Sequence, residues 1–336
     1  MTRTTMVPVA TRRMFVGLGG GALAATLATS AGGATLSGSL TLPGRAAALA
    51  ETRYRTVDAG GLKIFYREAG PTAAPVVLLL HGFPTSSRMF RNLIPMLADG
   101  YRVIAPDYPA FGHSAVPSRA DFRFTHAHIS EVVVALIEKL GVTRFAMYVM
   151  DFGGPIGYRL LLKYPERIPG VVIQNAPAFG EPTDGPLWAT LLAYWKDGSA
   201  AHRDAVRSSL TPDAVRNQYV AGVREPALID PDNWVIDSAL LARPGVDEIM
   251  LDLLYDIRNN RETLGSARQF FKAHPRKVMI ATGVNDPLFP GASMKPPGDI
   301  PEIEFHPIDS GHFALEDQCS QIGLLTRSFL RRVMPA

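Results

Sequence analysis

The segment YVMDFGG, residues 148–154, joins an apolar run to one acidic residue and two glycines. The apolar run is typical of a buried strand, and the residues that follow, PIGYRLLLKYPER at 155–167, have the period of a helix. A strand, a glycine-rich corner and a helix together form a turn that presents a nucleophile at its tip. Serine is the usual residue there, but this chain has Asp151. Asp151 is therefore either a nucleophile of another kind or a residue that caps the helix.

The other apolar runs of the chain predict an α/β fold. An alternating pattern on either side of Gly60 and Gly61 predicts an opening β-hairpin. Continuous apolar runs separated by helical segments predict a mostly parallel sheet flanked by helices. The expected strands are VVLLLHGF (76–83), YRVIAPDY (101–108), RFAMYVMDF (144–152), GVVIQNAP (170–177), RKVMIATG (276–283) and EIEFHPID (302–309), and the expected helices lie near residues 89–97, 126–140, 154 onward and 314–332.

Strand signals vanish in the segment that carries all three tryptophans of the chain. Helical patterns dominate this segment, which predicts a helical cap inserted before the last two strands. A cap in this position would lie over the carboxyl ends of the strands, where such sheets bind ligands. The expected domains are an export signal at 1–50, the first part of the core at 51–179, the cap at 180–272 and the second part of the core at 273–336.

The first 50 residues resemble a twin-arginine export signal. Arg12 and Arg13 precede a stretch rich in Gly, Ala and Thr, and small residues at Ala48 and Ala50 suit cleavage before Glu51. An uncleaved membrane anchor is the alternative, although glycines and threonines make the span weakly hydrophobic. We therefore expect the twin-arginine export machinery as a partner, a periplasmic or extracellular location, and no stable membrane association after cleavage.

The charge of the chain argues against nucleic acid as a partner. Its formal net charge is +3, but residues 1–50 hold four arginines and no acidic residue, so the remainder is close to neutral. A near-neutral chain lacks the basic surface that nucleic acids or anionic membranes attract. The single cysteine, Cys319, cannot form an internal disulfide.

Four strand ends carry residues with reactive side chains, and three of them contain glycines that would let the backbone turn sharply. In chain order, the reactive residue is a histidine at the first strand end, an aspartate at the second and third, and a histidine at the fourth. These ends are His81-Gly82-Phe83-Pro84, Asp151-Phe152-Gly153-Gly154, Val284-Asn285-Asp286-Pro287 and Ser310-Gly311-His312-Phe313.

These motifs, in this order, resemble the α/β-hydrolase fold superfamily, in the branch of epoxide hydrolases and haloalkane dehalogenases. The resemblance runs from about residue 54 to the C-terminus. It implies a catalytic triad of the nucleophile Asp151, the acid Asp286 and the base His312. It also implies an oxyanion hole formed by the backbone amides of Phe83 and Phe152, and no cofactor or metal. Without it, Asp286 could start a turn before a proline and His312 could be an ordinary loop histidine.

The serine in GHSAV, residues 112–116, is the strongest competitor for the role of nucleophile. This sequence lacks the second glycine of a serine elbow and follows a different strand. It fits better the family loop D-x-P-G-x-G-x-S, with Ala110 in place of the usual glycine. We therefore expect Ser114 to be structural.

An aspartate nucleophile directs the chemistry to saturated carbon. A carboxylate is ionised at neutral pH and needs no base to attack, but with an acyl substrate it would give an unstable anhydride. Displacement at a saturated carbon instead gives an alkyl ester on Asp151, which water activated by His312 then hydrolyses. Charge develops on an Asp151 oxygen in this second step, so the oxyanion hole acts there.

The residues around Asp151 favour an epoxide over a halide. Dehalogenases of this branch hold the halide with a tryptophan after the nucleophile and an asparagine after His-Gly, where this chain has Phe152 and Phe83. HGFP is the form of that loop in epoxide hydrolases. We therefore expect an epoxide hydrolase acting on a small apolar organic substrate, with a dehalogenase or a non-catalytic ligand-binding homologue as alternatives.

Epoxide hydrolases of this family use two cap tyrosines that donate hydrogen bonds to the epoxide oxygen. The candidates here are Tyr194, Tyr219 and Tyr255. The segment LLYDIRNN, residues 253–260, resembles the late Tyr-Arg motif of the family, but Ile257 stands directly before Arg258 and Tyr255 is displaced. Each tyrosine could equally be a packed aromatic residue with its hydroxyl at the surface.

Overall fold

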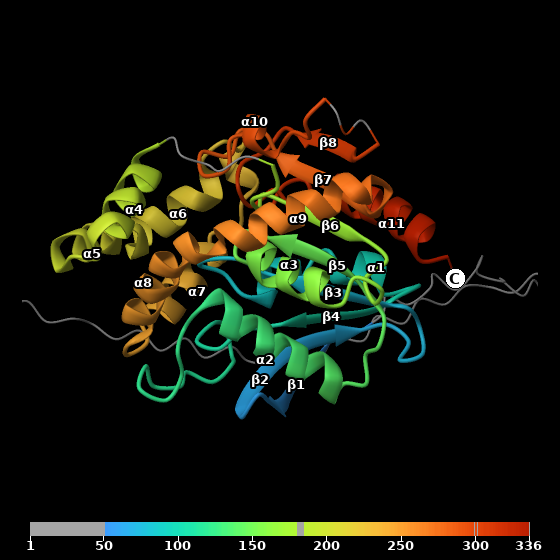
Figure 1. Cartoon of the computed structure of the whole chain (residues 1–336), viewed down its shortest axis with the longest axis horizontal. Helices are drawn as coiled ribbons and strands as arrows, with labels where there is room; N and C mark the ends of the chain where they lie inside the picture. The colour runs from blue at the N-terminus through green and yellow to red at the C-terminus, as the bar shows by residue number, and fades with distance from the viewer. Residues whose placement is uncertain (1–50, 180–184, 299, 301, 336) are drawn as a thin grey trace, which may run out of the picture. The chain divides into compact units, whose positions relative to one another are not determined.

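One eight-stranded sheet organises the described part of the chain (Figure 1). The computed structural model describes residues 51–179, 185–298, 300 and 302–335, so the expected leader and the first residues of the expected cap lie outside it. The strand order is β1-β2-β4-β3-β5-β6-β7-β8. The strands are β1 (Arg53–Ala59), β2 (Leu62–Ala69), β3 (Val76–Leu80), β4 (Arg102–Pro106), β5 (Phe145–Met150), β6 (Val171–Gln174), β7 (Val278–Gly283) and β8 (Glu304–Ile308).

The sheet is parallel except at its N-terminal edge. Strands β1 and β2 form the expected antiparallel hairpin, and β2 pairs antiparallel with β4. All pairs from β4 to β8 are parallel. Strands β3, β5, β6 and β7 are buried at every position, as strands covered on both faces must be. The predicted mostly parallel α/β fold is therefore confirmed.

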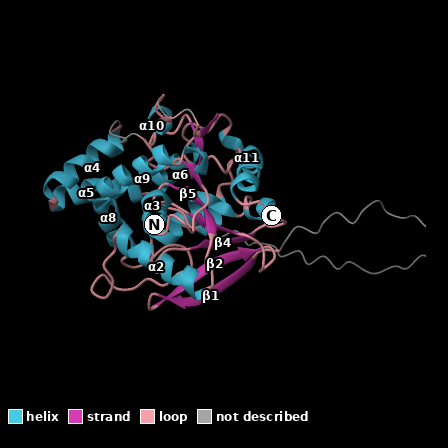
Figure 2. Cartoon of the chain, turned by 45° about the vertical axis from the view of Figure 1, so that its right-hand side comes forward, coloured by secondary structure: helices cyan, strands magenta, loops and turns pink. Residues whose placement is uncertain are grey.

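Helices cover both faces of the sheet. Helices α2, α3 and α9 pack side by side on one face, while α1 contacts α11 on the other (Figure 2). The α-helices are α1 (Ile94–Leu97), α2 (His126–Lys139), α3 (Gly153–Lys163), α4 (Pro186–Asp197), α5 (Ala200–Arg207), α6 (Pro212–Val220), α7 (Asp232–Leu241), α8 (Val246–Asp256), α9 (Arg261–Ala273), α10 (Gly291–Met294) and α11 (Cys319–Val333).

The helices from α4 to α8 form a group between β6 and β7 in the sequence. In Figure 1 the arrowheads of β5 and β7 point toward this group, so the helices lie at the carboxyl ends of the strands. Helix α9 also falls within the range expected for the cap, but it packs beside α3 over the sheet. The cap-like group therefore ends before α9, because the apolar face of α9 is buried against the core.

The last helix begins five residues later than expected, at Cys319. The preceding residues form turns whose side chains bind other elements. Glu316 pairs with Arg91 at 2.7 Å, and Asp317 accepts a hydrogen bond from Ser310 at 2.6 Å. These contacts anchor the segment that follows His312 in a non-helical conformation.

The Ser114 loop is structural, as expected. The Ser114 hydroxyl donates to the Asp107 carbonyl at 2.7 Å and accepts from the Phe65 amide at 2.9 Å. Ala110 has φ 70°, which is the left-handed conformation that the usual glycine would adopt more easily. Ser114 thus joins two backbone segments and is buried away from solvent.

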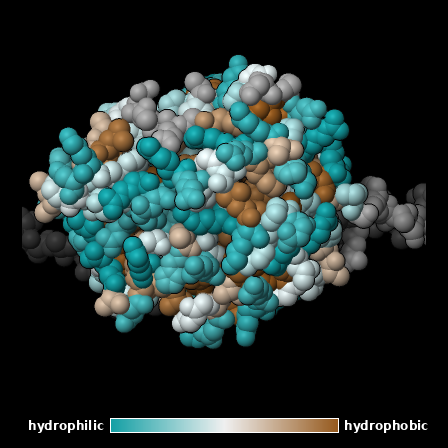
Figure 3. All heavy atoms as spheres, in the orientation of Figure 1, coloured by the Kyte–Doolittle hydropathy of each residue, from teal (hydrophilic) through white to brown (hydrophobic). Residues whose placement is uncertain are grey.

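The surface is polar over most of the face shown in Figure 3, with apolar residues in small separate groups. The large apolar side chains that are most exposed, Tyr54, Leu228 and Leu324, belong to different elements or loops. Scattered exposed apolar residues of this kind are normal for a folded chain. Among the described residues, no helix combines the length and the apolar character needed to cross a membrane.

Helix α3 approaches the end of β3 closely at Gly153. A Cβ at Gly153 would lie 2.2 Å from the Leu80 carbonyl oxygen, whereas a Cβ at Gly265 in α9 would meet nothing within 4 Å. We expect Gly153→Ala to lower the free energy of unfolding by about 2–4 kcal/mol, since backbone must move. Gly265→Ala should raise it by about 0.5–1 kcal/mol. Urea unfolding of both variants checks this, and equal effects would contradict the close packing.

Candidate active site

Asp151 occupies the tip of a strained turn between β5 and α3. Its φ is 50°, a left-handed conformation that costs a non-glycine residue roughly 1–2 kcal/mol. The neighbouring glycines make room for it, because a Cβ at Gly82 would lie 2.3 Å from the Asp151 Cβ. The turn thus lifts the carboxylate away from the backbone of its own strand and toward the cap side of the sheet.

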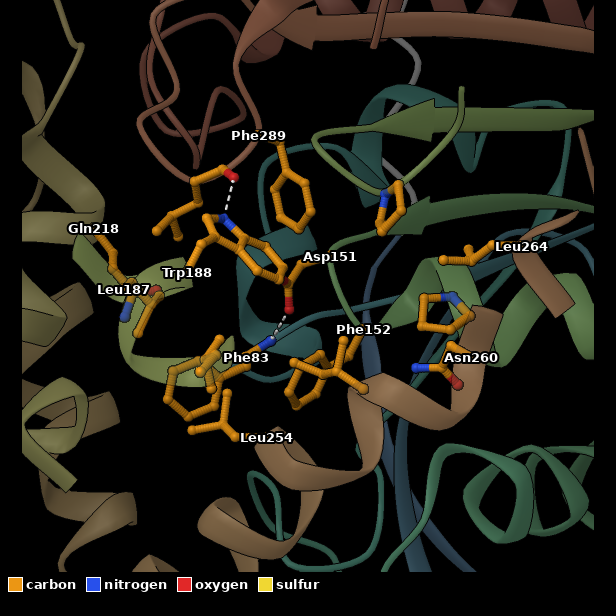
Figure 4. A pocket seen from close by; sticks show the side chains of 15 residues that line it. Phe83, Asp151, Phe152, Leu187, Trp188, Gln218, Leu254, Asn260, Leu264 and Phe289 are labelled. Carbon is orange, nitrogen blue, oxygen red and sulfur yellow. Dashed lines mark hydrogen bonds between the residues drawn. The ribbon is translucent and has the colours of Figure 1, made fainter. Parts of the chain in front are cut away.

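Backbone amides hold the Asp151 carboxylate. The Phe83 N–H donates to Asp151 Oδ1 at 2.7 Å, as the dashed line in Figure 4 shows. Burial raises the pKa of Asp151 above its ordinary value, while the nearby His312 and the backbone N–H groups of Phe83 and Phe152 act in the opposite direction. The two amides expected for the oxyanion hole therefore both interact with this carboxylate.

His81 fixes the loop that carries the Phe83 amide. Its Nε2 accepts from the Tyr108 N–H at 3.3 Å, so Nδ1 carries the proton and donates to the Gly82 carbonyl at 3.0 Å. Complete burial is the main reason that the pKa of His81 falls to about 4. The ring is therefore neutral at physiological pH and serves as a structural support.

His312 and Asp286 form a buried pair beside Asp151. His312 Nδ1 lies 2.8 Å from Asp286 Oδ2, and His312 Nε2 lies 3.9 Å from Asp151 Oδ2. Nε2 has no hydrogen-bond partner among the described residues. It is therefore free to accept a proton from a water molecule that approaches Asp151.

Asp286 stays ionised although it is buried. Burial raises its pKa, but the His312 charge and hydrogen bonds from His312, Asn175 and the Leu288 N–H outweigh burial, so the pKa lies below its ordinary value. For His312 the order is reversed: burial lowers the pKa, but the carboxylates of Asp286 and Asp151 raise it more. The ionised Asp286 thus stabilises the imidazolium form of His312.

Asn175 is a site residue that the sequence analysis did not single out. It follows β6 with φ 41°, and its Nδ2 donates to Asp286 Oδ2 at 2.8 Å. Its Oδ1 accepts from the Gly283 N–H at 3.0 Å, and its backbone carbonyl accepts from the Asp151 N–H at 3.1 Å. Asn175 therefore connects the Asp151 turn to the Asp286 loop. Asn175 lies at the end of a strand in the predicted parallel sheet, and this position could have identified it as a candidate site residue.

A mostly apolar cavity of about 50 Å³ opens beside the Asp151 carboxylate (Figure 4). Trp188 from α4 forms part of its wall, and its indole N–H donates to the Leu288 carbonyl at 2.8 Å. The residues that line the cavity are Phe83, Asp151, Phe152, Pro155, Pro177, Leu187, Trp188, Leu191, Gln218, Leu254, Ile257, Asn260, Leu264, Leu288 and Phe289. Few of these side chains are polar, so the cavity suits an apolar molecule.

None of the three tyrosines expected at the substrate lines this cavity. The Tyr194 hydroxyl accepts from Arg203 at 2.8 Å, and its ring lies 4.4 Å from that of Tyr255. The Tyr219 hydroxyl donates to the buried Asp237 at 2.5 Å. Their hydroxyls therefore bind other parts of the cap-like group.

Helical phase explains the position of Tyr255. Residues two apart in a helix point to different sides, and here it is Ile257 that reaches the cavity. The Tyr255 ring instead lies under the Arg258 guanidinium, whose carbon is 3.5 Å from the ring centroid. The expected substrate-binding role of these tyrosines is not supported by their contacts.

Comparisons with known proteins agree with this architecture. A family model described as alpha/beta hydrolase fold matches residues 75–318. An uncharacterized hydrolase of Saccharomyces cerevisiae is 39% identical over 260 residues, which cover 76% of this chain and 89% of the relative. A haloalkane dehalogenase of Mycobacterium marinum is 36% identical over 173 residues, which cover 49% and 57%. The crystal structure of an epoxide hydrolase from Vigna radiata superimposes with a TM-score of 0.62 at 23% identity, covering 84% of this chain and 99% of that one, which is a likeness of fold.

The raised pKa of His312 gives a pH dependence that can be measured. Neutral His312 is needed to accept a proton, and its pKa is raised, so we expect the rate of a water-dependent step at this site to fall on the acidic side with a midpoint above that of an ordinary histidine. Asp286→Asn removes the charge that raises the pKa of His312, so the midpoint should move to lower pH while the rate falls on the order of 10⁴-fold. Single-turnover rates between pH 5 and pH 9 check both effects. An unchanged midpoint in Asp286→Asn would show that Asp286 does not control the protonation of His312.

Proposed function

Because the chain belongs to the α/β-hydrolase fold family, we propose that it is a hydrolase that attacks a saturated carbon through Asp151, with an epoxide as its substrate. One observation carries this proposal. The Asp151 carboxylate has one oxygen held by the Phe83 amide, and its other oxygen lies 3.9 Å from the unpartnered Nε2 of His312. A carboxylate in the cavity wall, a backbone amide that binds it and a histidine beside it are what support the proposal.

The contacts of Asp151 argue against the helix-cap alternative. The residue at the N-cap position of α3 is Phe152, and it has no side-chain capping bond. The Asp151 carboxylate instead binds the amide of Phe83, which follows a different strand. A residue that served only to cap the helix would not need the left-handed turn or the approach of a histidine–aspartate pair.

In the first step, Asp151 attacks a ring carbon of the epoxide. A new bond forms between an Asp151 oxygen and that carbon, the carbon–oxygen bond of the ring breaks, and its electron pair stays on the ring oxygen. The product is an alkyl ester of Asp151 that carries an alkoxide. Water supplies the proton that converts this alkoxide into a hydroxyl group.

In the second step, His312 takes a proton from water as the water oxygen attacks the Asp151 carboxyl carbon. Negative charge moves onto the ester carbonyl oxygen, where the Phe83 and Phe152 amides can stabilise it. The ester bond breaks, the diol leaves, and the proton on His312 goes to the departing oxygen. The Asp151 carboxyl group then ionises again. The proton it releases replaces the one that the alkoxide took from water in the first step.

Dehalogenation is the second candidate, and one observation favours it. The haloalkane dehalogenase of Mycobacterium marinum is 36% identical to half of this chain. Against it, Phe152 and Phe83 carry no side-chain donor for a halide, and the Trp188 N–H is bound to the Leu288 carbonyl. The ester on Asp151 is common to both reactions, so the products decide between them.

Trapping of the ester tests this function directly. We expect His312→Gln, incubated with a panel of epoxides and haloalkanes, to gain the mass of the substrate-derived group at Asp151, because hydrolysis of the ester is blocked. Asp151→Asn should gain nothing and lose turnover. Intact mass spectrometry followed by peptide mapping measures the adduct, while diol and halide assays identify the reaction.

Ser114→Ala is the control for the competing serine. It should keep the adduct in the His312→Gln background, since Ser114 lies in the structural loop after β4. Turnover by Asp151→Asn at the rate of the unaltered protein would falsify the proposed nucleophile. Release of halide without any diol would favour the second candidate.

We also propose that residues 1–50 direct export and are removed before Glu51. The support is the sequence alone, with Arg12 and Arg13 ahead of a weakly hydrophobic stretch and small residues at Ala48 and Ala50. The double variant Arg12→Lys, Arg13→Lys keeps the charge but should abolish export through a twin-arginine pathway. N-terminal sequencing of the exported protein should begin at Glu51, and export of an intact protein that begins at Thr2 would refute cleavage.

A further inference from the structure

The attack of Asp151 requires hydrogen-bond donors for the atom that leaves the substrate carbon. Charge develops on that atom, and preorganised donors are how buried sites stabilise such charge. Three side chains that line the cavity carry an N–H group: Trp188, Gln218 and Asn260. The Trp188 N–H is already bound to the Leu288 carbonyl, so two amides remain.

Gln218 presents an unsatisfied amide to the cavity. It lies on α6, is 7% exposed, and its Oε1 is buried without a hydrogen-bond partner among the described residues. Asn217 precedes it in the same helix but is exposed and does not line the cavity. A buried amide oxygen without a partner is destabilising, and turning the amide over places its NH₂ group at the same point, where a ligand can accept from it.

Asn260 presents the second unsatisfied amide. It is 1% exposed, lies one helical turn after Ile257, and its Oδ1 is also buried without a partner among the described residues. Figure 4 shows Asn260 and Gln218 on opposite sides of Asp151 in that view. The two amides therefore line the same cavity from different places in the chain, α6 and the residue that precedes α9.

The surroundings of Asn260 determine which end of its amide is free. Its Nδ2 lies 3.4 Å from His126 Nδ1, and that nitrogen lies 2.9 Å from Asp256 Oδ2. An ionised carboxylate only accepts, so His126 Nδ1 must carry a proton and cannot accept from Asn260. Turning the amide over lets the Asn260 carbonyl accept from His126 and leaves the NH₂ group without a protein partner.

We infer that the side-chain NH₂ groups of Gln218 and Asn260 donate hydrogen bonds to the leaving atom when Asp151 attacks the substrate. This inference rests on the proposed function and names the groups that replace the expected tyrosines. The amides transfer no proton. They stabilise the alkoxide of an opened epoxide until water protonates it, and a departing halide would be held in the same way.

The rate of ester formation tests this role. In the His312→Gln background, Asn260→Leu and Gln218→Met keep the size of each side chain and remove its donors. We expect each to slow the gain of mass at Asp151 on the order of 10²- to 10³-fold, in line with the loss of one donor to developing charge. Subsequent hydrolysis of the ester, measured with His312 intact, should change less than threefold or so, because the leaving atom is no longer charged.

Two neighbouring asparagines supply matched controls. Asn217→Leu alters the exposed residue beside Gln218. Asn259→Leu alters the residue beside Asn260, whose Nδ2 donates to Asp256 Oδ1 at 2.8 Å and which does not line the cavity. Both controls should form the ester at the rate of the His312→Gln parent. Circular dichroism establishes whether each variant folds. If Asn260→Leu does not fold, Gln218→Met still tests the donor role.

The rate of ester formation with different leaving atoms distinguishes hydrogen-bond donation from a purely structural role of the two amides. Across substrates whose leaving atom becomes less basic, such as alkyl epoxides, fluoroalkyl epoxides and bromides, the deficit of both variants should shrink. An equal deficit for every substrate, or an unchanged rate of ester formation, overturns the donor role while the proposed function stands. Absence of any ester in the His312→Gln parent overturns the proposed function and the donor role together.

Discussion

The hydrogen bond from the Phe83 N–H to the Asp151 carboxylate is the contact on which the site depends. It joins the ends of β3 and β5, two adjacent strands, and it holds a side chain whose backbone is in a left-handed conformation. The approach is possible only because Gly82 has no side chain to meet Asp151. In the proposed reaction, the amide that orders this carboxylate at rest would also stabilise charge on the same oxygen in the ester, so preorganisation and chemistry would use one bond.

Much of the fold and the positions of the three ionisable residues of the candidate site could be predicted from the sequence, since they depend on local patterns. Buried parallel strands are continuous apolar runs, and their carboxyl ends converge on one edge of the sheet. Asp151 follows such a run directly, and Asp286 and His312 are the third and fourth residues after the ends of β7 and β8. The helix at 126–140 was predicted almost to the residue because Thr125 caps it and its apolar residues have a regular period.

The positions of the cap side chains could not be predicted in this way. Whether Tyr255 or Ile257 reaches the cavity depends on the phase of a short helix, and that phase is set by packing across the cap. Tyr219 is buried, and its hydroxyl binds Asp237, a partner 18 residues away that no local pattern indicates. Asn175 is a different case, because it stands at a strand end and the rule that found Asp151 also applies to it.

The cavity wall has a consequence for how molecules reach Asp151. Leu187, Gln218 and Leu288 line the cavity and also border a second, more open hollow between α4, α5 and α6. In the described part of the chain, these three side chains therefore belong to the walls of both hollows. Their rotation would be the smallest change that could join the two, with the helices on either side left in place.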